Sequence, residues 1–330
     1  MTSPQALEIL DLRHFTARQL RPLLTLQAQV WQSRLRWVYR DATELLLQYL
    51  DSQMLPGFVA LDRGRICGYT FCVYEGHKAV IGDIFSDCED RSDRSLEIAQ
   101  TLAKHLLEMM NASPDVMRIE AQLLLYDSGV LPTFFEGSTF TTYPRLFLER
   151  ALDTTHVSAI PIPVGLELCG WTMAAYQATA ELIRRAYVGH VDANINDQYR
   201  TLEGAQRFLH NIVRFPGCGT FDPAASWFLR DPRTQALVAV ILCSRVAPDV
   251  AHVTQLCVDV GMRGKGLGEA LIEVCLQTLP KRGYQAVTLT VSEQNKTAVS
   301  LYRKAGFQTR QRFDALVFEK QIKPVPYRVL

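Results

Sequence analysis

One pattern of segments occurs twice along the 330 residues, and this repeat restricts the fold more than any other feature. Residues 58–73 and 227–242 each hold two apolar strand-like segments around a polar turn, which indicates a β-hairpin. A helical pattern follows each hairpin, at 95–111 and at about 266–279, with apolar side chains along one face. Matching segments are separated by about 160–170 residues, so the sequence predicts two copies of one unit.

Each copy is expected to have the order β-α-(α)-β-β-β-α-β-α-β. This order is typical of an α/β (α+β) fold in which helices flank a mixed, mostly antiparallel sheet. We expect domains at 1–152 and 165–330, joined by a linker at 153–164. The prolines of this linker favour extended, non-helical chain.

The composition excludes several classes of protein. Lysine and arginine total 35 and aspartate and glutamate 34, so the net charge of +1 gives no attraction to nucleic acid or anionic lipid. The longest apolar run, 236–243, is far shorter than the roughly 20 residues that span a bilayer. The eight cysteines form no C-x-x-C pair and several lie in apolar runs, as expected for buried thiols in a reducing compartment. The sequence therefore predicts a cytoplasmic protein that binds no metal, nucleic acid or membrane.

A glycine-rich loop joins an apolar strand to the second predicted helix of this kind. It reads Arg263-Gly264-Lys265-Gly266-Leu267-Gly268. Glycines allow backbone N–H groups to point inward, and a helix N-terminus attracts anions, so we expect a phosphate or pyrophosphate to bind here. The loop lacks the G-x-x-x-x-G-K-[ST] pattern of a P-loop, and Glu269 stands where a dinucleotide fingerprint needs its last glycine.

A second segment follows the next strand, with Asn295, Ala298, Leu301, Tyr302 and Gly306-Phe307 in the order N-x-x-A-x-x-L-Y-x-x-x-G-F. Together with the R-x-x-G-x-G of the loop, it resembles the GNAT family of CoA-dependent N-acyltransferases. The resemblance is strong over about 165–322, whereas the N-terminal half is similar only in element order. It implies a tandem GNAT protein with acetyl-CoA as the acyl donor.

The resemblance also implies where the donor binds. Strand and loop residues would hold the pantetheine and pyrophosphate: Leu256, Cys257, Val258, Val260, Arg263, Gly264, Lys265, Gly266, Leu267 and Gly268. Residues of the next segment would complete the site: Asn295, Ala298, Leu301 and Tyr302. The strand side chains also suit a core, and Asn295 either contacts the pantetheine or caps the following helix.

Tyr302 is the candidate catalytic acid, because a phenol can protonate or hydrogen-bond a leaving thiolate; its alternative role is core packing. Some GNAT enzymes deprotonate the acceptor amine with a strand carboxylate, but the expected position holds Gln255. Glu293 and His190 remain candidate bases, directly or through water.

The acceptor is expected near the first helices of the second unit, where polar side chains are dense. Candidate substrate-binding residues are His190, Asp192, Asn196, Tyr199 and Gln255. A helix cap and turn would explain the same polar residues.

The N-terminal copy lacks the glycines of the loop. Its counterpart, residues 87–94, has four acidic residues against two arginines, Phe135 stands opposite Tyr302, and Ser128 stands opposite Asn295. We expect this degenerate copy to bind no CoA.

The sequence thus predicts an acyltransferase that moves acetyl from acetyl-CoA to a primary amine of a small polar or peptide acceptor, by direct attack in a ternary complex. The sequence leaves open whether the protein is a monomer or a homodimer. The alternative is a regulatory protein that senses acyl-CoA without turnover.

Overall fold

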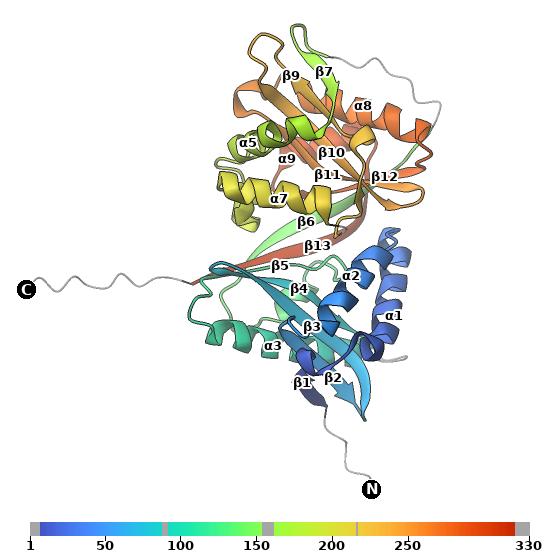
Figure 1. Ribbon diagram of the computed structural model, residues 1–330, viewed down its shortest axis with the longest axis vertical. Coiled ribbons are helices and arrows are strands. Elements are labelled where there is room, and N and C mark those ends of the chain that lie inside the picture. Colours follow the sequence, from blue (N-terminus) through green and yellow to red (C-terminus); the bar gives the residue numbers. More distant parts are fainter. Residues whose placement is uncertain (1–6, 88–91, 154–161, 216, 321–330) are drawn as a thin grey trace, which may run out of the picture. The chain divides into compact units, whose positions relative to one another are not determined.

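The computed structural model describes residues 7–87, 92–153, 162–215 and 217–320, and these ranges form two compact units (Figure 1). Unit 1 contains residues 1–26, 47–142 and 314–330, and unit 2 contains residues 27–46 and 143–313. Most of the predicted linker, at 154–161, lies outside the described residues.

Unit 1 is a mostly antiparallel sheet with helices. Its strands are β1 (Glu8–Asp11), β2 (Gly57–Asp62), β3 (Arg65–Glu75), β4 (Lys78–Ser86), β5 (Arg118–Gln122) and the end of β13 (Gln308–Glu319). Its helices are α3 (Ser92–Ala112) and α4 (Val130–Thr133), while α1 (Ala17–Leu35) and α2 (Arg40–Asp51) have residues in both units. Only the β4–β5 pairing is parallel among the described strand pairs of this unit.

Unit 2 follows the same plan. Its strands are β6 (Thr141–Ala151), β7 (Glu167–Gly170), β8 (Thr220–Phe221), β9 (Trp227–Arg230), β10 (Leu237–Ala247), β11 (Val250–Val258) and β12 (Ala286–Ser292). Its helices are α5 (Tyr176–Ala186), α6 (Asp192–Ile195), α7 (Leu202–Arg214), α8 (Leu267–Lys281) and α9 (Lys296–Lys304). The β11–β12 pairing is parallel, whereas β7–β9, β9–β10, β10–β11 and β12–β6 are antiparallel. The predicted repeat and the predicted α/β class with tandem, mostly antiparallel sheets are confirmed.

Nearly all of β6, the last strand of the first half, lies in unit 2, and the end of β13, the last strand of the second half, lies in unit 1. Strand β6 pairs with β12 along its length, from Arg145 opposite Ser292 to Ala151 opposite Ala286. The end of β13 pairs with β5, from Ala315 opposite Gln122 to Glu319 opposite Arg118. The compact units therefore differ from the predicted domains 1–152 and 165–330, because a free sheet edge can be completed by a strand from either copy.

Residues 27–46 also belong to unit 2 although they precede it in the chain. Trp37 packs against Phe147 and His252, with ring centroids 6.0 and 4.8 Å apart. Arg36 forms ion pairs with Glu149 at 3.2 Å and Asp249 at 2.9 Å. The N-terminal half thus contributes both this segment and strand β6 to unit 2.

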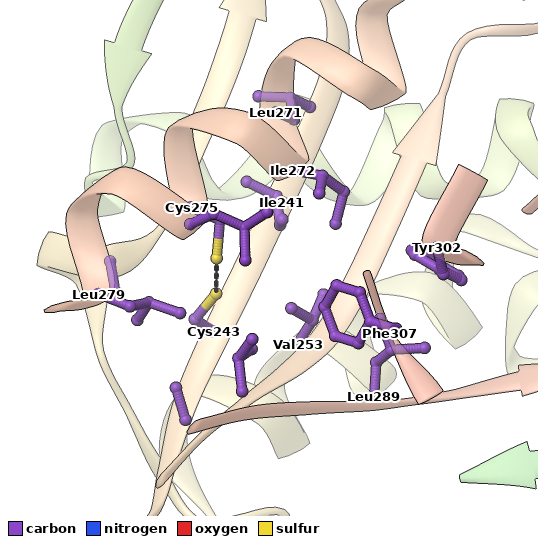
Figure 2. Packing of buried hydrophobic residues seen from close by; sticks show 14 of the residues in the cluster. Ile241, Cys243, Val253, Leu271, Ile272, Cys275, Leu279, Leu289, Tyr302 and Phe307 are labelled. Carbon is purple, nitrogen blue, oxygen red and sulfur yellow. Dashed lines mark hydrogen bonds between the residues drawn. The ribbon is translucent and has the colours of Figure 1, made fainter. Parts of the chain in front are cut away.

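Two apolar cores lie on opposite faces of the unit 2 sheet. Along β10, Ile241 and Cys243 pack with α8 and α9, while Val240 and Leu242 pack with α5 and α7, as the alternation of a strand requires. Figure 2 shows the first core, where Cys243 Sγ lies 3.5 Å from Cys275 Sγ of α8. This packing fixes α8, and with it the predicted anion-binding loop, against the sheet.

Candidate active site

A cavity of about 640 Å³ opens in unit 2 where two strands separate. The parallel register joins Val250–Val253 to Ala286–Leu289, while β11 continues to Val258 and β12 to Ser292. A register shift in the β10–β11 pairing occurs at the same level, between Leu242 and Cys243. Such irregularities bend a strand, so β11 leaves β12 and the space between them becomes available.

The glycine-rich loop forms one wall of this cavity, at the start of α8. Gly264 and Gly266 have φ of 75° and 78°, which glycine adopts at little cost, and no atom lies within 4 Å of a Cβ built on either. The loop lies at the N-terminus of a helix, where backbone N–H groups and the helix dipole favour phosphate. Arg263 and Lys265 add positive charge to this wall.

Hydrogen bonds hold the loop in place. The Arg263 guanidinium donates to the carbonyl oxygen of Ala186, at the end of α5. Asp259 accepts a bond from the Gly261 N–H at 3.1 Å and pairs with Arg185 at 3.0 Å. The loop is therefore tied to α5 before any ligand binds.

Helices α8 and α9 approach each other closely at Gly268. A Cβ at this position would lie 3.2 Å from Leu301 Cδ2, which is tighter than ordinary van der Waals contact. Leu301 and Gly268 both line the cavity. The last glycine of the motif thus allows the contact between the two helices that carry the predicted donor site.

Tyr302 of α9 lines the cavity and is 6% exposed. Burial raises the pKa of Tyr302 far above its usual range, and the nearby Asp192 carboxylate raises it further. The phenol therefore keeps its proton at physiological pH and can donate it within the cavity.

His190 and Asn295 also line the cavity and contact each other. Asn295 Nδ2 lies 3.2 Å from His190 Nε2, and Asn295 Oδ1 caps α9 by accepting from the Ala298 N–H at 3.1 Å. His190 Nδ1 accepts from the Asp192 N–H at 3.1 Å, and the Asp192 carboxylate in turn accepts from the Ser292 hydroxyl. Burial lowers the pKa of His190, and Arg263 also lowers it while Asp192 opposes the shift. The imidazole is thus neutral near pH 7.

Gln255 lies beneath this wall. It is 5% exposed, and its Oε1 accepts from the Tyr187 hydroxyl at 3.0 Å. Tyr187 lines the cavity and stacks on Tyr199, with ring centroids 4.0 Å apart. Gln255 therefore orients a cavity aromatic and offers no base at the position where some family members have a carboxylate.

The structure brings most of the predicted donor residues together around the cavity. Those that line it are Leu256, Cys257, Val258, Arg263, Gly264, Gly266, Leu267, Gly268, Asn295, Ala298, Leu301 and Tyr302, with His190. Val260 and Lys265 are exposed beside them. Further lining residues that the sequence reasoning missed are Ala186, Tyr187, Met262, Glu269, Thr297 and Lys304. Tyr187 carried a signal, since it precedes His190 in the polar segment.

Other candidates lie outside the lining of this cavity. Glu293 pairs with Arg312 at 3.3 Å. Asn196 accepts from the Gln198 N–H at 3.0 Å, which is the capping role that the sequence left open. Asp192 and Tyr199 lie behind His190 and Tyr187, and their role in acceptor binding stays a prediction.

The matching positions of unit 1 have other partners. Phe135, opposite Tyr302, is buried and packs against Phe140, with ring centroids 4.9 Å apart. Ser128, opposite Asn295, donates to Asp314 at 2.8 Å. Within the counterpart loop, residues 88–91 lie outside the described residues. That unit 1 binds no CoA stays a prediction.

Two searches over the described ranges bear on the predicted absences. No helix there is long and apolar enough to cross a membrane. No group of three or more histidine, cysteine, aspartate or glutamate side chains there is placed to hold a metal ion.

Comparisons with known proteins identify the relatives of the cavity segment. Residues 180–307 match the sequence model of the acetyltransferase (GNAT) family. A mycothiol acetyltransferase of Beutenbergia cavernae is 33% identical over 159 residues, which are 47% of this chain and 49% of that protein. A peptidyl-lysine N-acetyltransferase of Escherichia coli is 32% identical over 105 residues, 32% of this chain and 60% of that protein. The chain thus spans about half the length of these curated relatives.

Solved structures match the fold over a longer range. A GCN5-related N-acetyltransferase from Sphaerobacter thermophilus has a TM-score of 0.65 and 16% identity, covering 96% of this chain and 97% of its own. A tandem GNAT protein from the clavulanic acid biosynthesis pathway has a TM-score of 0.59 and 16% identity, covering 96% and 100%. At this identity the likeness concerns the fold alone, and it includes both units. The cavity and its loop lie in or beside the segment 180–307, and this segment is similar to the GNAT family of acetyltransferases.

Proposed function

We propose that this protein is an N-acetyltransferase that moves acetyl from acetyl-CoA to a primary amine of a small polar or peptide acceptor. The observation that carries the proposal is one cavity lined both by the glycine-rich start of α8 and by the buried phenol of Tyr302. An anion site and a proton donor in a single cavity suit a donor that carries a pyrophosphate at one end and a thioester at the other.

The residues present fit acetyl-CoA. The open backbone at Gly264 and Gly266 would hold the pyrophosphate, with Arg263 and Lys265 nearby. The arm that follows would lie along Leu256, Cys257 and Val258, which line the cavity beyond the point where the β11–β12 pairing ends. Acetyl-CoA would supply the activated acetyl group.

The proposed transfer forms one bond and breaks another. The amine nitrogen bonds to the acetyl carbon, and the carbon–sulfur bond breaks. Tyr302 donates its hydroxyl proton to the sulfur and recovers a proton from the new amide nitrogen. The acceptor arrives as an ammonium, because an alkylamine has a pKa of about 10.4, and must lose one further proton before it attacks.

Neither candidate base is placed to take that proton directly. Glu293 pairs with Arg312, and both ring nitrogens of His190 face N–H groups. Gln255 has no basic group. We therefore route the proton to solvent through water.

The acceptor class is supported by two observations. Relatives of the matched segment are named as a mycothiol acetyltransferase, a peptidyl-lysine N-acetyltransferase and a ribosomal-protein alanine N-acetyltransferase. In this chain, Asp192 contacts the cavity residue His190 and offers a carboxylate to an ammonium, while Tyr199 stacks on the cavity residue Tyr187 and positions it. We place the protein in the cytoplasm, because seven described cysteines are free thiols.

A thiol-release screen tests the proposal. The full chain is incubated with acetyl-CoA and a panel of amino acids, polyamines, aminoglycosides and peptides, and free CoA is measured. Release with at least one amine is expected, together with an acetyl-CoA-dependent rise in Tm. A rise in Tm without release from a broad panel would favour the acyl-CoA sensor. No rise in Tm would overturn the donor assignment itself.

A further inference from the structure

The contact between His190 and Asn295 joins two hydrogen-bond donors. Asn295 Oδ1 accepts from the Ala298 N–H, so the NH₂ group of the amide points at His190 Nε2. The Asp192 N–H points at His190 Nδ1. A neutral imidazole has one lone pair and one N–H, so it cannot accept from both sides.

The backbone settles which nitrogen carries the proton. The Asp192 N–H is fixed by the chain, and it donates to Nδ1 at 3.1 Å, whereas the Asp192 carboxylate is 3.7 Å from the same atom. The lone pair of the ring therefore lies on Nδ1, and Nε2 carries the hydrogen. This Nε2–H then meets the amide NH₂ of Asn295 at 3.2 Å.

Turning the amide does not remove the conflict. With Oδ1 toward His190, the amide NH₂ would face the Ala298 N–H and the α9 cap would be lost. Placing the ring proton on Nδ1 would set it against the Asp192 N–H. Each arrangement leaves the chain of groups one acceptor short, and no other partner of either side chain occurs in the part of the chain that the structure describes. An unsatisfied donor pair costs free energy, which an added acceptor would recover.

The two donors lie in the wall of the cavity that the glycine loop and Tyr302 also line. The ring is held edge-to-face against Tyr187, with centroids 5.1 Å apart, so its direction is set by packing as well as by Asp192. Because the two nitrogens lie 3.2 Å apart and both residues line the cavity, one oxygen atom in the cavity can lie within hydrogen-bond distance of both.

We propose that His190 Nε2–H and Asn295 Nδ2–H together bind a carbonyl oxygen of the acyl donor. The identity of that ligand rests on the proposed function. The donor offers two kinds of carbonyl oxygen, in its thioester and in the amides of its pantetheine arm. In the first case the pair stabilises negative charge on the thioester oxygen during transfer, and in the second it positions the arm. His190 acts as a hydrogen-bond donor in both, and not as a base.

Nitrogen-15 NMR of the full chain tests the tautomer and the ligand separately. The His190 ring signals, assigned by comparison with His190→Gln, are expected to show a neutral Nε2–H ring in the free protein. Addition of acetyl-CoA should shift the Nε2 signal, and an equal shift with CoA would assign the pantetheine amide instead of the thioester. A neutral Nδ1–H ring, or no shift with either ligand while Tm rises, would overturn the proposal, since water alone would then fill the site.

Variants distinguish a donor from a base. Gln places an N–H near the position of Nε2 but cannot take up a proton, whereas Ala removes both functions. If the oxygen is that of the thioester, His190→Ala should lower kcat about 100-fold, as loss of one oxyanion donor does, and His190→Gln should recover most of it. If it is an amide oxygen, the same pattern should appear in the Kd for CoA. Equal losses in both variants would show that His190 is a base.

Two variants of Asn295 test the second donor of the site. Asn295→Ser keeps a helix-capping oxygen but has no group that reaches His190, whereas Asn295→Asp keeps the cap and presents an acceptor to Nε2–H. Both should weaken the ligand-dependent shift of His190, and Asn295→Asp should shift Nε2 even without ligand. An unchanged response in Asn295→Ser would contradict the two-donor site. The NMR arms need no acceptor amine, so they stand even if no thiol is released in the screen.

Discussion

At the scale of single residues, the sequence located the cavity but not its internal contacts. The loop from Arg263 to Gly268 was predicted from its glycines before a helix, and Tyr302 from the resemblance of its segment to a family motif. The contact of His190 with Asn295 joins residues 105 positions apart, and the bond of Tyr187 with Gln255 joins residues 68 apart. Whether such pairs form depends on how far β11 and β12 separate. A local sequence pattern does not predict this separation.

Tyr302→Phe should lower kcat roughly 100-fold while the acetyl-CoA-dependent rise in Tm persists. Loss of the hydroxyl removes the proton donor and leaves the ring in its packing. Since burial raises the pKa of Tyr302, the wild-type phenol stays protonated as pH rises, and its deprotonation should cause no fall in rate up to about pH 10. Steady-state kinetics against pH check both statements.

Tyr284→Phe is the matched control. Tyr284 is also a buried phenol of unit 2, but its hydroxyl donates to Asp222 at 2.8 Å and it lies outside the cavity lining. This variant should lose stability with little change in kcat. A similar kcat in Tyr302→Phe and the wild type would remove Tyr302 from the mechanism.

At the scale of elements, strand and helix order followed from hydrophobic periodicity, because each element must bury one face. The start of α8 was also predictable, because glycines precede its apolar face; in the structure Gly266 is its N-cap and has a left-handed φ. The separation of β11 from β12 was not, because both segments continue as strands, to Val258 and Ser292, beyond the point where their pairing ends.

Two substitutions of Gly266 separate charge from backbone strain. Gly266→Ala imposes the left-handed φ on a residue with a Cβ, at a cost of about 1–2 kcal/mol, and meets open space. Gly266→Asp adds the same strain and a negative charge at the proposed pyrophosphate site. We expect CoA affinity to fall at least about tenfold more in Gly266→Asp than in Gly266→Ala, measured by calorimetric titration.

Equal losses in these two variants would mean that strain alone governs binding. The anion assignment of the loop would then be wrong. A higher salt concentration should reduce the difference in CoA affinity between the two variants, because it screens the repulsion between the added carboxylate of Gly266→Asp and the pyrophosphate.

At the scale of the whole molecule, the sequence predicted two copies but not the exchange of β6 and β13. The closing strands β6 and β13 have the same place in their repeats. The sheet of each half could therefore be completed by its own closing strand or by that of the other half. Side-chain contacts hold the end of β13 in unit 1. Arg118 pairs with Glu319, and Asp314 accepts from the Ser128 hydroxyl and from the Gly129 N–H at 2.6 Å. These contacts involve residues about 200 positions apart and leave no signal in a single sequence.

A chain that ends at Phe313 should therefore have a destabilised unit 1. It lacks the part of β13 that pairs with β5, together with Asp314 and Glu319. Hydrogen exchange should show β5 losing protection, and calorimetry should show a transition at lower temperature. A chain that ends at Lys320 keeps β13 whole and is the control.

Equal protection of β5 in the two truncated chains would mean that the exchanged strand contributes little to unit 1. If β5 loses protection only in the chain that ends at Phe313, the end of β13 completes the sheet of unit 1.

The exchange also sets an order for folding on the ribosome. Strand β5 ends at Gln122, yet the strand that covers its edge runs to Glu319, near the end of the chain. The first half therefore emerges with an unpaired sheet edge, and that edge stays open while nearly two hundred more residues are translated. The nascent first unit needs protection from foreign strands throughout that interval, so slow translation should favour its aggregation.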